Sequence, residues 1–280
     1  MKFATWNVNG IRARASQLHE WMERERPDVV CLQELKAELT QVPEILRRQE
    51  YHAFWHCCKG YSGVSLQLRK DSFPTEPVYR HPPFDLESRV VTAELGNLVV
   101  ASMYVPNGGK DYSAKIAFLK QTIEWAGALC RDGRELLICG DLNIARDEID
   151  VHPRERKPNG VGQRPEERAL FRELLDTGLT DVGRAMDPDN AGLFTWWAPW
   201  RNLRARNIGW RLDYMLASSG LFARTQRCVV QSEVGTSDHA PVVMEALPRG
   251  ETGIDLGALD EGSVLEGRAG KVIHEPGHLH

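Results

Sequence analysis

The amino-acid sequence predicts a layered α/β sandwich, in which mixed or antiparallel sheets are covered by helices on the outside. Short apolar runs of strand length alternate with amphipathic helical segments, without the regular rhythm of a βαβ protein. Gly96-Asn97 joins two of these runs as a hairpin signature. The 280 residues exceed the ~250 that a single sandwich or α/β domain reaches. We therefore expect one domain, residues 1–247, followed by a tail.

Turn residues bound the apolar runs that we interpret as strands, and amphipathic periodicity predicts three helices. The first helix covers residues 17–26 and keeps its apolar side chains on one side. The second covers residues 116–130 and ends before Gly133, and the third begins near Pro165, a favoured first-turn position. The predicted strands are residues 2–6, 27–33, 63–68, 89–95, 98–105, 135–139, 214–217, 227–231 and 241–246.

Composition and charge are those of an ordinary globular chain, with 42% hydrophobic and 26% charged residues. No apolar signal region and no run long enough to span a bilayer is found, so we expect a cytoplasmic protein. The net charge is −4, of which residues 248–280 contribute −3 through three basic and six acidic residues. The body is thus nearly neutral. The Gly-rich acidic segment 248–280 has no apolar periodicity and predicts an extended or disordered tail.

The six cysteines indicate free thiols in a reducing compartment. They lack metal-finger spacing, and several lie inside apolar runs such as Val-Val-Cys-Leu. Cys57 and Cys58 are adjacent, which suits neither an unstrained disulfide nor a CxxC redox pair.

Polar residues stand at the ends of several predicted strands. Each alone is weak evidence, because Asp and Asn end strands for turn-forming reasons. In a sheet with antiparallel neighbours, however, the C-terminal ends of some strands and the N-terminal ends of others share one rim. Together these residues predict one site. They are Asn7, Asn9, Glu34, Tyr104, Asn107, Asp141, Asn143, Asp213, Asp238 and His239.

Residues 195–211 interleave aromatic and basic side chains. They hold four Trp and four Arg without one acidic residue. Aromatic faces and guanidinium groups in this arrangement suit a surface that grips a phosphate backbone and stacks against bases. A Trp cluster that packs a core beside a solvated loop is the alternative interpretation.

The polar rim favours metal-assisted cleavage of a phosphodiester. Carboxylates and amides without thiolate ligands suit a hard cation, Mg²⁺ with Mn²⁺ as a substitute. Phosphodiester cleavage needs an activated water, positive charge on the phosphate oxygens and stabilisation of the leaving alkoxide. Competing schemes fit less well, because the sequence has no GxSxG elbow, Walker A loop or HExxH motif.

Six motifs then stand in a fixed order along residues 1–247. They are Trp6-Asn7-Val8-Asn9-Gly10-Ile11-Arg12, Leu32-Gln33-Glu34, Tyr104-Val105-Pro106-Asn107, Gly140-Asp141-Leu142-Asn143, Trp210-Arg211-Leu212-Asp213-Tyr214 and Ser237-Asp238-His239. In this order and approximate spacing the sequence resembles the exonuclease III/AP endonuclease family of the DNase I-like endonuclease/exonuclease/phosphatase superfamily. The fifth motif looks closer to the branch of the main human apurinic endonuclease than to the enteric bacterial exonuclease.

The resemblance implies a four-layer α/β/β/α sandwich of two mixed, mainly antiparallel sheets flanked by helices. It also implies roles for the residues of the rim. Glu34 would be the principal Mg²⁺ ligand, with Asn9 and Asp238 near the same ion. Asp141 would activate the water, helped by Asn143, and both would lie close enough to the metal to act as ligands. His239, held by Asp213, would contact the scissile phosphate, and Asn7 and Tyr104 would complete the anion hole. Asn9 departs from the human-type pattern, which has Asp there.

The same resemblance implies how DNA is bound. Trp196, Trp210 and Leu212 match positions that wall a pocket for a flipped, base-free sugar, which costs less to extrude because no base pairing is lost. Lys110 and Trp200 match positions that enter the double helix around the lesion. Three further candidates for substrate contact are Asn107, Asn159 and Arg201, the last two as phosphate contacts.

We therefore expect a monomeric Mg²⁺-dependent nuclease of base-excision repair, acting on the nucleoid in the cytoplasm. It would cut 5′ to abasic sites in double-stranded DNA, and would have 3′ to 5′ exonuclease or 3′-phosphodiesterase activity on 3′ blocking groups. One alternative is a nonspecific nuclease, or a phosphatase of inositides or lipids, from the same superfamily. Another is a nonenzymatic RNA- or DNA-binding relative, whose mark would be a missing catalytic side chain.

Overall fold

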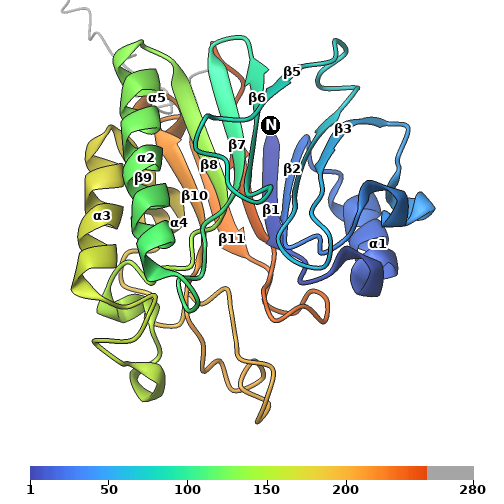
Figure 1. Ribbon diagram of the computed structural model, residues 1–280. Helices are drawn as coiled ribbons and strands as arrows, with labels where there is room; N and C mark the ends of the chain where they lie inside the picture. Colours follow the sequence, from blue (N-terminus) through green and yellow to red (C-terminus); the bar gives the residue numbers. More distant parts are fainter. Residues whose placement is uncertain (251–280) are drawn as a thin grey trace, which may run out of the picture.

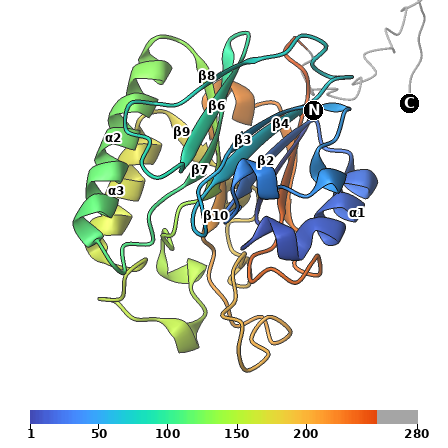
Figure 2. The same ribbon diagram turned by 45° about the vertical axis from the view of Figure 1, so that its right-hand side comes forward.

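The computed structural model describes residues 1–250, and the segment 251–280 lies outside this description. Two six-stranded sheets pack face to face, with helices on both outer faces (Figures 1 and 2). The predicted four-layer α/β/β/α sandwich is confirmed. The predicted tail begins at residue 248, so nearly all of it falls outside the described residues.

The first sheet has the strand order β11-β12-β1-β2-β4-β3. Only β1 and β2 run parallel among its described pairings. The parallel pair carries Asn7 and the residues that lead to Glu34 to the same end of the sheet, because Asn7 lies opposite Gln33. The strands are β1 (Lys2–Asn7), β2 (Val29–Gln33), β3 (Tyr51–His56), β4 (Val64–Arg69), β11 (Thr225–Val230) and β12 (Val242–Ala246).

The second sheet has the order β5-β6-β7-β8-β10-β9. Its one parallel pair among the described strands is β7 with β8. Gly96-Asn97 forms the turn between antiparallel β6 and β7, as the hairpin signature predicts. Both sheets are therefore mixed and mainly antiparallel. The strands are β5 (Val78–Arg80), β6 (Val90–Leu95), β7 (Leu98–Tyr104), β8 (Glu135–Asp141), β9 (Leu179–Asp181) and β10 (Asp213–Ser218).

Helices cover the two outer faces, as Figures 1 and 2 show. Helix α1 (Ala15–Glu25) packs Trp21 edge-on against Trp6 of the first sheet, with ring centroids 5.6 Å apart. Helices α2 (Tyr112–Arg131) and α3 (Pro165–Asp176) lie side by side on the second sheet, and Pro165 takes the predicted first-turn position. Two short helices, α4 (Val182–Met186) and α5 (Ser219–Phe222), complete the body. Within residues 1–250, no helix has both the length and the apolar character that a bilayer span requires.

Alternation along the strands divides the apolar side chains between three cores. Phe3, Val29 and Cys31 point between the sheets, whereas Ala4 and Val30 point toward α1. A third cluster fills the space between the second sheet and α2 and α3. All six cysteines are free. The continuous apolar runs predicted as strands are thus buried on both faces, which requires covering layers on either side.

Three strands and two helices were absent from the sequence-based expectation. β5 and β9 have three residues each, and α4 and α5 have five and four. Such short elements carry too few residues for a periodic signal. β3 is longer, but it is an edge strand with intermediate burial at five of its six positions, so it lacks a continuous apolar run.

A buried ion network holds the segment that leads into β10. The Arg211 guanidinium makes paired hydrogen bonds of 2.7–3.0 Å to both Asp150 and Asp181. Arg184 donates to Asp150 at 2.6 Å, and all four side chains are at least nine-tenths buried. Burial opposes the charge, but the Asp181 carboxylate keeps the pKa of Arg211 well above its usual value. This network fixes the backbone that positions Leu212 and Asp213.

Replacing Arg211 with Met should lower the free energy of unfolding by about 3–5 kcal/mol, because two buried carboxylates then lose a partner. Chemical denaturation of the full chain measures this. Arg227→Met is the matched control, since Arg227 is exposed on β11; it should change stability by less than about 0.5 kcal/mol. Equal effects of the two substitutions would contradict a stabilising network.

Candidate active site

Strand register brings the predicted polar residues to one rim of the sandwich. Asp141 at the end of β8 lies opposite Tyr104 of parallel β7 and opposite Asp213, the first residue of antiparallel β10. Gly140 is required in this arrangement, because a Cβ there would lie 1.9 Å from the Met103 carbonyl oxygen. The long segments before α3 and before β10 extend beyond this end of the sheets, at the bottom of Figure 1.

The side-chain amide of Asn7 joins the two sheets at the centre of the rim. Its Nδ2 group donates to Glu34 Oε1 and to Asp141 Oδ2, both at 2.9 Å. Its Oδ1 accepts from the Asn9 amide at 3.0 Å, and the side chain is fully buried. Both Nδ2 protons are therefore engaged. For Asn7 to donate to a phosphate, one of these carboxylate bonds would have to break, so the geometry favours a positioning role.

Glu34 and Asn9 face a common cation. The Lys36 ammonium lies 2.6 Å from Glu34 Oε2 and 2.6 Å from Asn9 Oδ1. Asn9, Glu34 and Lys36 all adopt left-handed backbone conformations, with φ of 44°, 53° and 50°. Such strained geometry in non-glycine residues is concentrated at functional sites. The carboxylate and amide oxygens around this ammonium are the donors that Mg²⁺ prefers, so the residues fit the implied ion.

The second predicted acidic residue near the ion is held from two sides. Asp238 accepts from Asn9 Nδ2 at 2.7 Å and from the Trp196 indole nitrogen at 3.0 Å. Burial raises its pKa, but the His239 charge and these two hydrogen bonds outweigh burial and lower the pKa. The carboxylate is thus anionic and oriented toward Asn9. Trp196, predicted from DNA binding alone, also positions this group.

His239 is oriented by Asp213 and directed toward Asp141. Its Nδ1 lies 2.8 Å from Asp213 Oδ2, and its Nε2 lies 3.8 Å from Asp141 Oδ2. Burial lowers the pKa of His239, but Asp213 and Asp141 outweigh burial and raise it to about 10. The imidazolium therefore persists at neutral pH. At 3.8 Å the Nε2–H makes no direct hydrogen bond to Asp141. Since His239 lines the adjoining cavity, this N–H is available to a phosphate oxygen bound there.

Asp141 has the properties of a base at neutral pH. Burial, with the nearby Asp213 and Glu34 carboxylates, raises its pKa to about 7 against the opposing charge of His239. A catalytic base is most efficient when its pKa lies near the working pH. The Asn143 backbone amide donates to Asp141 Oδ1 at 2.9 Å, and the side-chain Nδ2 of Asn143 donates to the Val105 carbonyl oxygen. Asn143 therefore fixes the orientation of the carboxylate.

Tyr104 remains a neutral phenol at this rim. Burial, together with the charges of Glu34 and Asp141, raises its pKa far above the usual value. Its hydroxyl is therefore a hydrogen-bond donor. The Arg89 guanidinium lies over the Tyr104 ring, 4.8 Å from the centroid. This stacking adds a positive charge beside the cavity that carries the predicted anion hole.

Part of the polar rim opens into a cavity of about 330 Å³. Trp196, Trp210 and Leu212 line it together with Glu34, Tyr104 and His239. Trp196 and Trp210 meet edge-on with centroids 5.7 Å apart, so they form a corner of the wall. The Trp210 indole nitrogen is buried without a hydrogen-bond partner among the described residues.

The remaining predicted DNA contacts lie outside this cavity or at its edge. Asn107 lines it and donates to Asn143 Oδ1 at 3.3 Å. Lys110 lines an adjoining groove of about 800 Å³ that shares Glu34, Lys36 and Tyr104 with the cavity. Trp200 is 60% exposed in the long segment before β10, and Arg201 and Asn159 are exposed and line neither space. The structure thus gathers three predicted wall residues and leaves three predicted contacts on the outside.

Comparison with known proteins identifies the family. A model of the Endonuclease/Exonuclease/phosphatase family matches residues 4–239. The chain belongs to this family. It is 34% identical over 254 residues to an exodeoxyribonuclease of Bacillus subtilis, which covers 86% of this chain and 98% of that protein. It is also 34% identical to the DNA repair nuclease APEX1 of Danio rerio, covering 87% of this chain and 81% of that protein. The resemblance to the exonuclease III/AP endonuclease family is confirmed.

Solved structures show the same fold. An AP endonuclease from Archaeoglobus fulgidus superposes with a TM-score of 0.79 at 28% identity, covering 88% of this chain and 99% of that one. The 3′-5′ exonuclease NExo from Neisseria meningitidis gives 0.81 at 29% identity, with the same coverage. This chain is accordingly a nuclease-type hydrolase.

Two residues of the site were missed by sequence reasoning. Lys36 follows Glu34 by two positions, and Arg89 precedes β6; neither belongs to a quoted motif. The Lys36 side chain contacts Glu34 and Asn9 only because Lys36 adopts a left-handed conformation, which sequence alone does not reveal. A Lys two residues from a predicted metal ligand could have been flagged by charge alone.

Asp141→Asn should slow single-turnover DNA cleavage by about 10²–10⁴-fold, because it removes the base while keeping a side chain of the same shape. The dissociation constant for DNA should stay within a few-fold of the original value. Asp189→Asn, at an exposed position that lines neither the cavity nor the adjoining groove, is the control and should leave both quantities unchanged. An equal loss of binding would refute the assignment of Asp141 as base.

Proposed function

We propose that this chain is a Mg²⁺-dependent AP endonuclease of base-excision repair, which cleaves 5′ to an abasic site and leaves a 3′ hydroxyl. The observation that carries the proposal is the cavity in which Trp196, Trp210 and Leu212 face the catalytic rim. Relatives named as exodeoxyribonuclease, DNA repair nuclease and AP endonuclease support this substrate class. A Neisseria 3′ phosphatase bound to a product DNA hairpin, at 29% identity, supports a further activity on 3′ ends.

The proposed reaction uses the rim as the structure arranges it. Bound between Glu34, Asn9 and Asp238, Mg²⁺ would supply positive charge to the phosphate and to the leaving oxygen. Asp141, oriented by Asn143, would remove a proton from the attacking water. His239, held cationic by Asp213, would donate from Nε2 to a phosphate oxygen, and the neutral Tyr104 phenol would donate beside it.

The cavity size and its chemistry favour a base-free sugar. An abasic nucleotide is extruded at lower cost than a paired one, because no base pair is broken. The aromatic wall of Trp196 and Trp210 can pack on the deoxyribose face. Lys110 in the adjoining groove and exposed Trp200 and Arg201 would contact the duplex around the lesion. The enzyme would act as a monomer on cytoplasmic DNA, consistent with six free thiols.

Single-turnover cleavage of a labelled duplex with one tetrahydrofuran abasic analogue tests the proposal. An undamaged duplex and a duplex with a recessed 3′ end are assayed in parallel, each in Mg²⁺ and in EDTA. Incision at the analogue alone, abolished by EDTA, is the expected result. Digestion chiefly from the 3′ end would support the proposed catalytic residues but would make exonuclease the main activity. Equal cutting of undamaged DNA would favour a nonspecific nuclease. Binding without cleavage would favour the nonenzymatic alternative.

Trp200→Ala should raise the dissociation constant for abasic duplex by about 10-fold, in line with the ~1–3 kcal/mol of one base-aromatic stack. Single-turnover cleavage at saturating enzyme should change less, since Trp200 lies outside the catalytic cavity. Fluorescence anisotropy and quenched-flow cleavage measure the two quantities. Val78→Ala is the control for loss of an exposed apolar side chain, because Val78 is 52% exposed and lies on β5, paired with Glu94 at the end of β6 away from the rim. An unchanged dissociation constant would rule out the proposed contact between Trp200 and the duplex.

A further inference from the structure

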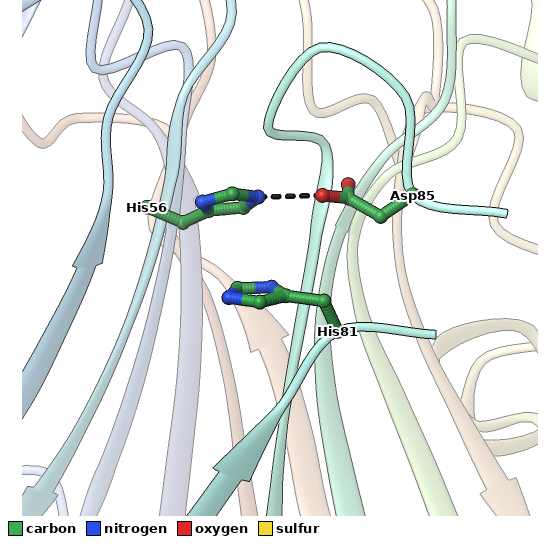
Figure 3. A group of neighbouring side chains, drawn as sticks. All are labelled: His56, His81 and Asp85. Atoms are coloured by element: carbon green, nitrogen blue, oxygen red, sulfur yellow. Dashed lines mark hydrogen bonds and ion pairs between the residues drawn. The ribbon is translucent and has the colours of Figure 1, made fainter. Parts of the chain in front are cut away.

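A second group of metal-ligating side chains lies at the outer edge of the sandwich. His56 ends β3, the edge strand of the first sheet, and His81 directly follows β5, the edge strand of the second sheet. Asp85 lies in the connection from β5 to β6. Figure 3 shows the two imidazole rings stacked one above the other, with the Asp85 carboxylate directed at His56. None of the three belongs to the catalytic rim.

The three side chains bring their donor atoms together. One donor atom from each of them lies within 4.8 Å of the other two. His56 Nε2 is 2.5 Å from Asp85 Oδ2, and the ring centroids of His56 and His81 are 3.9 Å apart with 32° between their planes. His81 is exposed and the other two are half-buried. An ion from solvent can therefore reach the group without any opening of the fold.

Backbone groups hold two of the three side chains. His81 Nδ1 lies 3.0 Å from the Val90 carbonyl oxygen, an acceptor, so Nδ1 carries the proton. Figure 3 shows His81 Nε2 directed away from Asp85, so the exposed His81 side chain would have to turn for its free lone pair to face an ion held by the other two residues. Asp85 Oδ1 accepts from the Arg89 and Val90 amides, both at 2.8 Å, and so Oδ2 is left for a ligand. Hydrogen bonds from His56 and these amides outweigh burial and lower the pKa of Asp85. The carboxylate is thus anionic and fixed.

We propose that His56, His81 and Asp85 form a second metal site, which binds Zn²⁺ or a divalent ion of similar chemistry. Two imidazoles and one carboxylate, with water in the fourth position, match a three-ligand tetrahedral zinc site. Nitrogen donors also distinguish this site from the oxygen donors of the catalytic rim, which suit Mg²⁺. The proposal does not depend on the substrate of the nuclease site.

Binding would replace the hydrogen bond between His56 Nε2 and Asp85 Oδ2. A neutral His56 would bind the metal through Nε2 and carry its one ring proton on Nδ1, so this step needs no loss of a proton to solvent. Ligand atoms around a tetrahedral Zn²⁺ are about 3.3 Å apart, given bonds of ~2.0 Å. His56 Nε2 and Asp85 Oδ2 would therefore move apart slightly, which rotation of the half-buried His56 side chain allows.

The ion would connect the edges of the two sheets beside the nuclease groove. β3 and β5 have no strand partner in common, because each ends a different sheet. Asp85 also accepts a hydrogen bond from the Arg89 backbone amide, and the Arg89 side chain lies over the Tyr104 ring. Bound metal would brace the turn that carries Arg89 to the cavity. A metal at this edge is therefore expected to raise thermal stability more than it changes cleavage.

The full chain, stripped of metal and held in excess Mg²⁺ so that the oxygen-rich rim is filled, provides the test. Isothermal titration with Zn²⁺ counts bound equivalents, and Co²⁺ absorption in the visible range reports tetrahedral coordination. Asp85→Asn is the informative variant, because the Asn Oδ1 atom still accepts the two backbone amides while the anionic ligand is lost. His81→Gln removes a second ligand, and His52→Gln on the same strand is the matched control.

We expect Asp85→Asn and His81→Gln each to lose one equivalent of Zn²⁺ and the tetrahedral Co²⁺ spectrum, whereas His52→Gln keeps both. Zinc should also raise the melting temperature of the parent and the control, and not that of the two ligand variants. Since the tail histidines are present in every variant, they do not affect this difference. The same number of equivalents and the same affinity in all four proteins would overturn the proposal. No DNA is used, so the outcome is independent of the nuclease assignment.

Discussion

The hydrogen bonds of one buried amide, Asn7, connect the two halves of the nuclease site. Glu34 follows a strand of the first sheet and Asp141 ends a strand of the second, and Asn7 Nδ2 donates to both. Two carboxylates this close repel one another, and burial removes the water that would screen them. A donor with two protons between them offsets part of that repulsion. The carboxylates of Glu34 and Asp141 are therefore held at a fixed separation.

Charge at the rim is balanced by two cations, which stand next to strands β2 and β12 of the first sheet. His239 lies between Asp213 and Asp141, and Lys36 contacts Glu34. The Lys36 ammonium occupies the position between two predicted metal ligands, so it would have to move when Mg²⁺ binds there. It would then be free to meet a DNA phosphate in the adjoining groove, which it also lines. The same residues thus serve a protein that must hold acidic side chains together and then receive a polyanion.

Much of the fold could be predicted from the sequence, because the central strands are apolar runs bounded by turn residues. β5 and β9 could not be, since three residues show no periodicity, and they become strands only by pairing with β6 and β10. The site followed a similar division. Residues within ordered motifs, such as Asp141 and His239, could be chosen in advance, whereas Lys36 and Arg89 depend on backbone turns that no motif records. The exposed positions of Trp200 and Arg201 leave their predicted DNA contacts open to experiment.

By itself the sequence determined the family, the order of the main strands and helices, and which polar residues end strands, because these follow from local patterns. Tertiary structure alone decided which of those residues touch. The antiparallel register of β10 on β8 sets Asp213 opposite Asp141, and the turn before β12 directs His239 back to both. The tertiary structure also places His56 beside His81 and Asp85, residues with no shared motif. Contacts between different sheets depend on strand order and layer packing, which local sequence does not encode.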